Sequence, residues 1–582
     1  MEKRFILFII LTFLVFFGFQ YFMPKNLQNQ PAPVSAVETP TAPTTADNAT
    51  ASVPTTPTDG RSIAQDSAGE TESLSPEDTH ATAQKIVIDG DLYTAVLDNR
   101  GGVLTSWELK DYQTTKKNKD DPTRVFDMIT GASMNEKLYP GALIINGDDN
   151  SHTAANNDYY NVSIEGVSDF AGEKLVPPVA VKLTLKRGDL QIEKVWNFDK
   201  DNYTANLSIV GTKAGRPLDG HFFLGEDIGP AMEHFASSGS VLTSVYSVGG
   251  KVKRESPPKD PQEPKRLEGG VSWAGLDMQY FSMIAIPRQP LNYFNIQTTR
   301  LREISIDGET VERDMLKVML PLNPVGGDNY HLYLGPKRQE NLQRVGTADL
   351  SKVIDYGMFS IIIYPLLAAL RWIHRFVQNY GFAIVILTFV LSLILFPFRL
   401  KSMMSMKKMS VLQPRIKAIQ DKYRQYKATD PRKRDMNTEI MALYKENGVN
   451  PVGGCLPMIL QMPLLIAFYS LLAHTIDLRQ APFIWWIQDL SAKDPYYVLP
   501  IAMGLTSFIS QKLAPMAPST DPTQAKMMMI MPLIFTFIFF NMSSGLNLYF
   551  LCSNIFQVVF QKVAERWIPS TAAPVPAKGR AK

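Results

Sequence analysis

The chain has 582 residues, a formal net charge of +3 and two cysteines. This length is too great for one soluble core and predicts two or more domains, and the small net charge by itself indicates no acidic partner. Cys455 and Cys552 both lie in apolar runs, and the long polar region before them contains no cysteine. The sequence therefore excludes a disulfide framework and a cysteine metal site.

The N-terminal residues 1–23 begin with two basic side chains, followed by a Phe-rich apolar run that stops at Pro24. A cleaved signal peptide has a shorter apolar run, and small residues follow it at once. Here the nearest small-residue site is around Ala36, well beyond the run. The pattern indicates an uncleaved anchor, the first membrane span, with its N-terminus in the cytoplasm. Cleavage of this segment is the alternative.

Residues 24–84 are mainly Pro, Thr, Ala, Ser and acidic residues. Such a composition cannot bury enough apolar surface to fold, so we expect a flexible linker. After this linker the pattern changes to alternating apolar and polar residues, with hairpin turns expected at Asn99–Gly102 and Arg187–Asp189. These signals recur to about residue 335 and predict a large antiparallel β-sandwich over residues 85–345.

After residue 350 the composition is that of a membrane protein. The stretches long and apolar enough to be spans are residues 380–398, 455–473, 497–513, 527–542 and 546–563. Residues 353–378 are ambiguous, because Pro365 and Arg371 leave only a short apolar stretch. The residues Trp372, His374 and Arg375 suit a membrane interface. We interpret this segment as an amphipathic helix that lies on the bilayer surface.

Charge counts decide the topology. The segment from Arg399 to Asn447 has 13 Lys and Arg against 5 Asp and Glu, whereas residues 474–496 have 2 against 3. Basic loops stay in the cytoplasm, so we predict six spans with both chain ends inside and the β-domain outside, in the periplasm. Counting the ambiguous segment as a further span would put the basic loop on the outer side of the membrane, against this rule. The predicted connections are a cytoplasmic basic hairpin, a periplasmic loop, a cytoplasmic loop and a cytoplasmic tail, at residues 399–450, 474–496, 514–526 and 564–582 respectively.

The basic hairpin has its own pattern. Apolar residues recur at spacings of four and three along two segments joined by a Pro-containing turn, which predicts two antiparallel amphipathic helices. Their outer face is cationic and suits anionic phospholipid headgroups or ribosomal RNA. A loop that only sets topology is the alternative. The candidate client or ribosome contacts are Met403, Met404, Met406, Lys407, Lys408, Arg432, Lys433 and Arg434.

Polar side chains also lie inside the predicted spans. In lipid such side chains turn toward neighbouring helices or a hydrated cavity. Helical spacing of ~100° per residue places Thr388, Ser392 and Arg399 on nearly one face. Each of these residues could form hydrogen bonds between helices or line a hydrated groove. The set as a whole favours the groove. The candidate groove residues are Thr388, Ser392, Arg399, Gln461, Ser507, Asn547 and Asn554.

The membrane half contains the segments "YGFAIVILTF", "KMSVLQPRIKAIQ", "ALYKENGVNPVGGCLPMILQMPLLIAFYSLL", "LRQAPFIWWIQDLSAKDPYYVLPIAMG" and "SSGLNLYFLCSN". These segments resemble the YidC membrane protein insertases, in the long form typical of Gram-negative bacteria. The resemblance covers residues 350–563 closely and is weaker in the β-domain.

The resemblance implies a signal anchor, a five-helix core whose groove opens to the cytoplasm and the lipid but not to the outside, a periplasmic β-supersandwich and a mobile cytoplasmic hairpin. Proteins of this kind are not enzymes. They act as insertases and chaperones that accept nascent membrane proteins in the inner membrane, alone or beside the Sec translocon, without nucleotide or cofactor.

One departure from the family pattern concerns the groove. In this family the second span usually carries a groove arginine where this chain has Ser392, and the second of two tyrosines often found in the last span is Phe550 here, after Tyr549. Tyr549 and Phe550 join the candidate groove residues through this resemblance. A buried cation at the usual position is not expected. Arg399, one heptad after Ser392, either faces the groove or extends toward the lipid headgroups.

Three other function classes are less well supported, and a channel or secondary transporter is the main alternative. Coupled transporters commonly have inverted repeats and intramembrane carboxylates, whereas this chain shows no repeat and no Asp or Glu within the five core spans. A protease would need a nucleophile paired with histidine, but His374 and His474 lie at span edges with no serine motif beside them. A non-catalytic assembly scaffold overlaps with the insertase reading.

Overall fold

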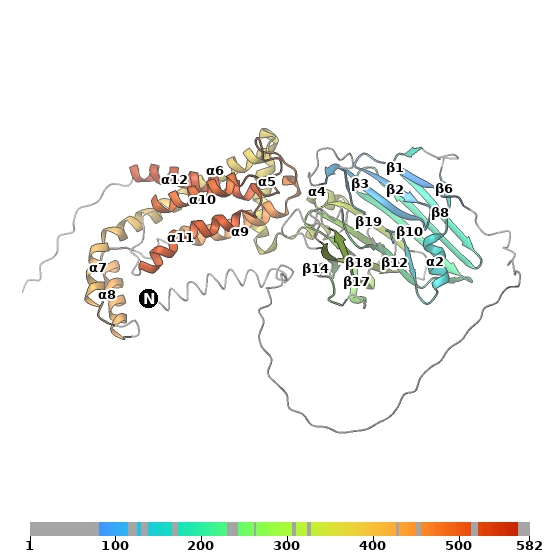
Figure 1. The fold of residues 1–582 in the computed structure, drawn as a ribbon, viewed down its shortest axis with the longest axis horizontal. Coiled ribbons are helices and arrows are strands. Elements are labelled where there is room, and N and C mark those ends of the chain that lie inside the picture. The colour runs from blue at the N-terminus through green and yellow to red at the C-terminus, as the bar shows by residue number, and fades with distance from the viewer. Residues whose placement is uncertain are drawn as a thin grey trace, which may run out of the picture.

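The computed structural model describes residues 81–114, 125–129, 138–165, 173–229, 242–260, 263–304, 310–322, 328–347, 349–426, 430–449, 456–513 and 522–567. The predicted first span, nearly all of the predicted linker and most of the predicted tail lie outside these residues. Strands gather at one end of the molecule and long helices at the other (Figure 1).

The described strands form two sheets. The smaller sheet has the order β4 (Val125–Asp127), β3 (Val103–Gln113), β2 (Tyr93–Asp98), β1 (Lys85–Asp89) and β7 (Lys174–Leu175). The larger sheet has the order β5 (Leu143–Ile145), β12 (Gly220–Gly225), β18 (Thr310–Pro321), β17 (Leu291–Ile304), β15 (Lys265–Asp277), β16 (Phe281–Pro287), β19 (Asp328–Pro336), β10 (Thr204–Lys213), β9 (Leu190–Phe198), β8 (Val179–Arg187) and β6 (Asn161–Ile164). Off this path, β13 (Thr243–Val248) pairs with β15 and with β14 (Lys251–Glu255), and β11 (Arg216–Pro217) pairs with β10.

Both predicted hairpins are present in these sheets. β2 pairs with β3 and β8 pairs with β9, in each case antiparallel and across the predicted turn. Gly101 and Gly102 have φ of 72° and 60°, a conformation that glycine adopts without strain. The sandwich is antiparallel as predicted, except that β1 and β7 pair in parallel. Local alternation cannot reveal that exception, because it does not specify which strand becomes the neighbour.

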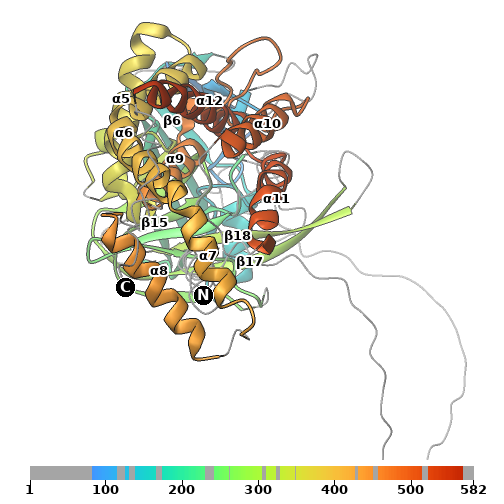
Figure 2. The same cartoon turned by 90° about the vertical axis from the view of Figure 1, so that its left-hand side faces the viewer.

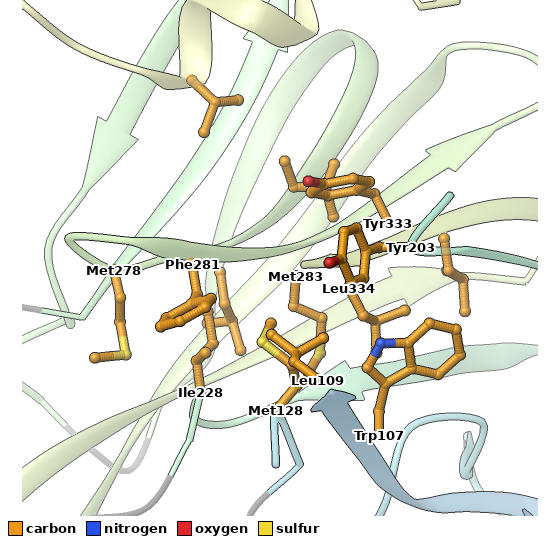
Figure 3. Close-up of a cluster of buried hydrophobic side chains, with 14 of the residues drawn as sticks. Trp107, Leu109, Met128, Tyr203, Ile228, Met278, Phe281, Met283, Tyr333 and Leu334 are labelled. Atoms are coloured by element: carbon orange, nitrogen blue, oxygen red, sulfur yellow. The ribbon is translucent and has the colours of Figure 1, made fainter. Parts of the chain in front are cut away.

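The core of the β-domain lies between the two sheets. Trp107 and Leu109 of β3 pack with Met283 of β16 and Leu334 of β19, all with almost no exposed surface (Figure 3). The ring of Trp107 also stacks on that of Tyr93, with centroids 3.9 Å apart. Large aromatic side chains dominate the energetics of such a core because each buries a large apolar area.

One lysine points into this core. The inward positions of β9 alternate as Ile192, Lys194 and Trp196, and Lys194 has no exposed surface. Its Nζ donates hydrogen bonds to the carbonyl oxygens of Gly101 and Gly141, at 2.6 and 2.7 Å. Burial lowers the pKa of Lys194 to about 7. The alternation of β9 predicts the inward direction, but sequence reasoning did not single this lysine out.

The remaining helices of the β-domain and its connector are α2 (Asp149–Asn157), α4 (Gln339–Arg344), η2 (Leu350–Val353) and η3 (Gly357–Phe359). The membrane half contains α5 (Ser360–Val377), α6 (Tyr380–Val411), α7 (Gln413–Lys422), α8 (Arg432–Glu446), α9 (Leu456–His474), η5 (Ile476–Leu478), α10 (Val498–Leu513), α11 (Pro522–Phe539) and α12 (Ser544–Trp567). Each predicted core span coincides with one of the helices α6, α9, α10, α11 and α12.

The helix α6 differs from its predicted span. We expected the span to end at Phe398, but the helix continues without interruption to Val411. The added residues are mostly Leu, Met, Lys and Ser, and the next proline is Pro414. A helix need not stop where the apolar run stops, because good helix formers continue it into water.

Length and composition alone do not settle the number of spans. Among the described residues, Gly357–Val377 and Tyr380–Val411 are the two helical stretches long and apolar enough to cross a membrane. The apolar stretches Gln461–His474, Val498–Leu513 and Ile530–Phe539 are shorter. The helix α5 runs across the ends of the other helices rather than along them (Figure 1). The six-span count therefore stays a prediction.

The helices form an open arrangement. The helix α12 packs against α6 on one side and α10 on the other, α11 packs mainly against α10, and α9 packs mainly against α5. Figure 2 shows α11 on the far side of the bundle from α6.

The helices α7 and α8 form the predicted hairpin. Leu412 and Ile416 of its first arm pack with Met436 and Ile440 of the second, and Met409 at the end of α6 joins them. Pro414 lies in the first turn of α7, where a missing N–H has no consequence. The spacing of four and three thus correctly identifies the buried face.

Candidate functional site

The polar stripe of α6 faces inward. Thr388 and Ser392 are 1% and 3% exposed. The hydroxyl of Thr388 donates to the carbonyl oxygen of Ile384 at 2.6 Å, so its hydrogen bond is satisfied within its own helix. The apolar neighbours Leu393 and Ile394 are more than half exposed and so lie on the opposite, lipid-facing side. The shared face deduced from helical spacing is therefore present.

Arg399 lies at the inner end of this stripe and turns into the bundle. Its Nη2 donates to Oε1 of Gln461 on α9 at 3.1 Å. The side chain of Tyr549 on α12 lies close to those of Gln461 and Arg399. The other guanidinium nitrogen, Nη1, is buried and has no hydrogen-bond partner among the described residues. Arg399, Gln461 and Tyr549 thus meet where α6, α9 and α12 converge.

Tyr549 is held in place by an aromatic partner. Its ring stacks on that of Phe468 of α9, with centroids 4.1 Å apart and planes 11° from parallel. The adjacent Phe550 faces Phe539 of α11 instead, at 4.7 Å between centroids. Consecutive residues point ~100° apart on a helix, so Tyr549 and Phe550 line different sides of α12.

The two asparagines of α12, Asn547 and Asn554, form hydrogen bonds with neighbouring helices rather than with Arg399. Nδ2 of Asn554 donates to Oγ of Ser507 on α10 at 2.6 Å. Nδ2 of Asn547 donates to the carbonyl oxygens of Phe539 and Met542, at 3.2 and 3.4 Å, where α11 ends. For these residues the structure shows the interhelical hydrogen bonding that the sequence left open as an alternative.

Backbone hydrogen bonds connect the start of α12 to the segment that precedes α10. The amides of Ser544 and Gly545, which begin α12, donate to the carbonyl oxygens of Ala492 and Leu490 at 2.7 and 2.8 Å. Asp494 is 1% exposed and accepts from the amide of Leu499 at 2.7 Å, in the first turn of α10. Sequence reasoning did not single out these residues, although an Asp followed by Pro just before a span is a recognisable helix start.

The helix α11 is attached along one stripe. Pro532 and Phe539 are buried, while Ile530, Leu533 and Phe537 are between 53% and 74% exposed. On the attached side, a Cβ placed on Gly504 of α10 would lie 2.0 Å from Oγ1 of Thr536, so glycine permits this close approach. From Ile530 to Phe539, most of the circumference of α11 is therefore apolar and not covered by the other described helices.

The candidate hairpin contacts lie around the end of α6 and at the tip. Met404, Lys408 and Arg434 are exposed, whereas Met403, Met406 and Lys407 are half-buried. The guanidinium of Arg432 lies over the ring of Tyr426, 4.7 Å from its centroid. The side chain of Lys433 lies outside the described part.

No group of His, Cys, Asp and Glu that could hold a metal occurs among the described residues.

Two family models match the chain in succession. The YidC periplasmic domain matches residues 85–369, and the 60Kd inner membrane protein matches residues 372–571. The Membrane protein insertase YidC of Syntrophus aciditrophicus is 34% identical over 578 residues, which cover 96% of this chain and 98% of that protein. The chain belongs to the YidC membrane protein insertase family. The resemblance deduced from the quoted segments is thereby confirmed.

The further matches include a second insertase and a solved structure. The Membrane protein insertase YidC of Geotalea daltonii is 33% identical over 98% of this chain and 100% of its own length. A solved active YidC insertase, with its first transmembrane domain resolved, is 19% identical over 84% of this chain and 94% of that chain, with a TM-score of 0.33. Membership of the YidC family also confirms that the chain is an insertase rather than an enzyme, an inner membrane protein with a periplasmic β-domain.

Proposed function

We propose that this chain inserts nascent membrane proteins through a hydrophilic groove bordered by α6, α9 and α12. The observation that carries this proposal is the meeting of Arg399, Gln461 and Tyr549 between these helices, where one guanidinium nitrogen has no hydrogen-bond partner among the described residues. A partly buried cation with spare hydrogen-bonding capacity is unfavourable in a membrane and marks a path for polar groups.

The energetics fit an insertase that uses no nucleotide. Carrying a polar tail through ~30 Å of hydrocarbon is strongly unfavourable, and a polar site part-way across shortens that path. The favourable term is burial of the client's apolar helix, worth about 25 cal/mol per Å². The exposed apolar side chains of α11 offer a surface against which that helix can rest.

Arg399 takes over part of the role of the missing groove arginine. It lies ~10 Å beyond Ser392 along the helix axis, nearer the cytoplasmic end. At this position Nη1, which has no partner among the described residues, can donate a hydrogen bond to an acidic side chain of the client as it enters. Water screens a charge near the membrane edge, so the attraction is weaker than at the position of Ser392.

Topology and partners extend this proposal. We place six spans in the membrane, with α5 lying at the outer interface and both termini in the cytoplasm. The orientation of α5 across the bundle and its exposed Ile361, Trp372 and Phe376 support this placement. The basic hairpin suits anionic phospholipids and the ribosome. The Sec translocon and its accessory subunits are the further partners that membership of this family suggests.

Reconstitution tests the proposal. The purified full-length protein in liposomes should insert a small single-span client, which is measured as protection of the translocated tail from added protease. Empty liposomes are the control. A scaffold without insertase activity would give the same protection as empty liposomes, and that result would refute the proposal.

A further inference from the structure

A buried carboxylate follows the outer end of α9. Asp477 lies in η5 and its side chain is only 2% exposed. It accepts from Nε of Arg371 on α5 at 2.7 Å and forms an ion pair with Nη2 of Arg338 at 2.9 Å. Arg338 immediately precedes α4, the short helix at the end of the β-domain. One carboxylate therefore joins three elements that are far apart in the sequence.

A second acidic residue completes this group. Nη1 of Arg371 lies 2.5 Å from Oε1 of Glu340, and Nε of Arg338 lies 3.8 Å from Oε2 of the same residue. Two arginines are thus shared between two carboxylates, and the formal charges balance. We name Arg338, Glu340, Arg371 and Asp477 the Asp477 clamp.

Because Asp477 is buried, the clamp stabilises only one arrangement of α5 and the connector relative to the end of α9. Removing a charge from water is unfavourable unless its partners replace the lost hydration in good geometry. Arg338 and Glu340 are about half exposed and can turn to solvent, but Asp477 cannot. If α5 or the connector shifts, the carboxylate loses partners while remaining buried. The clamp therefore resists displacement of α5 relative to the end of α9.

Further hydrogen bonds tie the same segment to the β-domain. Nε2 of Gln279 donates to the carbonyl oxygen of Ala473 at 2.7 Å, and Nε2 of Gln480 donates to that of Gln113 at 2.7 Å. These bonds leave the β-domain from other strands and bypass α5. Because these bonds do not involve α5, attachment of the β-domain can be tested separately from attachment of α5.

We propose that Asp477 is a positioning residue for insertion: it fixes α5 against the outer end of α9, the helix that carries Gln461 at its inner end. This inference rests on the proposed function, because its consequence is read in the insertion of a client. In this arrangement α5 and α9 move as one body. The parts free to move during insertion are then α11 and the hairpin.

The test measures insertion and local order in the full-length protein. Asp477→Asn and, separately, Arg371→Gln should slow insertion of a neutral single-span client by roughly five- to tenfold, within the usual range of coupling between sites. Both should also increase hydrogen exchange of the amides at the end of α5. Asp477→Glu keeps the charge and should restore most of the rate.

Gln480→Asn is the matched control. Asn tolerates the positive φ of 58° at this position, but its shorter side chain cannot reach Gln113. It removes one tie between this segment and the β-domain, although Nη2 of Arg479 still donates to the carbonyl oxygen of Gln113, and it leaves the clamp intact, so insertion should stay near wild type. Equal slowing by Gln480→Asn and Asp477→Asn would overturn the proposal, as would an unchanged rate or unchanged exchange in both clamp variants. Failure of the wild-type protein to insert would instead refute the proposed function.

Discussion

The β-domain and the membrane helices solve the problem of polar groups in opposite ways. In the β-domain a fully buried lysine is satisfied by two carbonyl oxygens, and aromatic side chains close around it. Between the helices a partly buried arginine has one nitrogen with no hydrogen-bond partner in the described part of the chain, and α11 contacts its neighbours along a single stripe. Dense packing gives a unique, stable structure. A polar group whose hydrogen bonds are incomplete can instead bind a transient client.

The largest difference between the two regions should appear when a large side chain is removed. Trp196→Ala empties a fully buried position between the sheets and should lower the free energy of unfolding by about 3–5 kcal/mol. Trp485→Ala, in the outer loop of the membrane half where the side chain is 83% exposed, should change it by less than ~0.5 kcal/mol. Urea unfolding of the full-length protein in detergent measures both, and similar losses would contradict the contrast.

A smaller effect is expected at the incompletely satisfied arginine. Arg399→Gln should slow insertion of a client with an acidic tail by about tenfold, since a hydrogen bond to a charged group contributes about 1.5 kcal/mol. A matched client with a neutral tail should be unaffected. Ser392→Arg should speed the acidic client. The liposomes are made of neutral lipid, so that charged headgroups do not compete with Arg399. Equal effects on both clients would mean that Arg399 only sets the membrane topology.

The buried lysine predicts a pH dependence. Its folded pKa of about 7 lies below the ordinary lysine value of 10.5, so above pH 7 the unfolded chain binds more protons than the folded chain. The free energy of unfolding should therefore rise with pH, by at most about 1.4 kcal/mol per unit. Unfolding between pH 7 and pH 9 should show this slope in the wild type but not in Lys194→Met. Lys182→Met, at a half-exposed lysine on β8, should retain it.

The smallest effect is expected from removing the β-domain itself. Deleting residues 30–330 retains the first predicted span and every residue of the Asp477 clamp. Because no catalytic constellation occurs in the β-domain, insertion of a simple client should remain substantial. Complete loss, with normal expression and folding, would mean that the two regions act together.

The sequence predicted the β-domain and the hairpin well, because both depend on local periodicity. Alternation located the turns at Asn99–Gly102 and Arg187–Asp189, and spacings of four and three located the buried face of the hairpin. It could not predict the parallel pairing of β1 with β7 or the Asp477 clamp. Both depend on which distant segments become neighbours, and no local pattern records that.

The candidate site was predicted in part for the same reason. Helical spacing placed Thr388, Ser392 and Arg399 on one face, and all three face the bundle. Spacing cannot tell which helix lies opposite, so Asn547 and Asn554 were grouped with Arg399 although they bond to α10 and α11.

The continuous helix α6 has a mechanical consequence. At 1.5 Å per residue its 32 residues form a rod of ~48 Å, and the rod carries the groove face at one part and Met409 of the hairpin at its end. Within α6, Pro397 removes one backbone hydrogen bond between the positions of Ser392 and Arg399, so a bend can occur there before it occurs at Leu412, where α6 gives way to α7. A force on the hairpin would therefore move Arg399, which lies on the hairpin side of Pro397, more directly than Ser392, which lies on the other side.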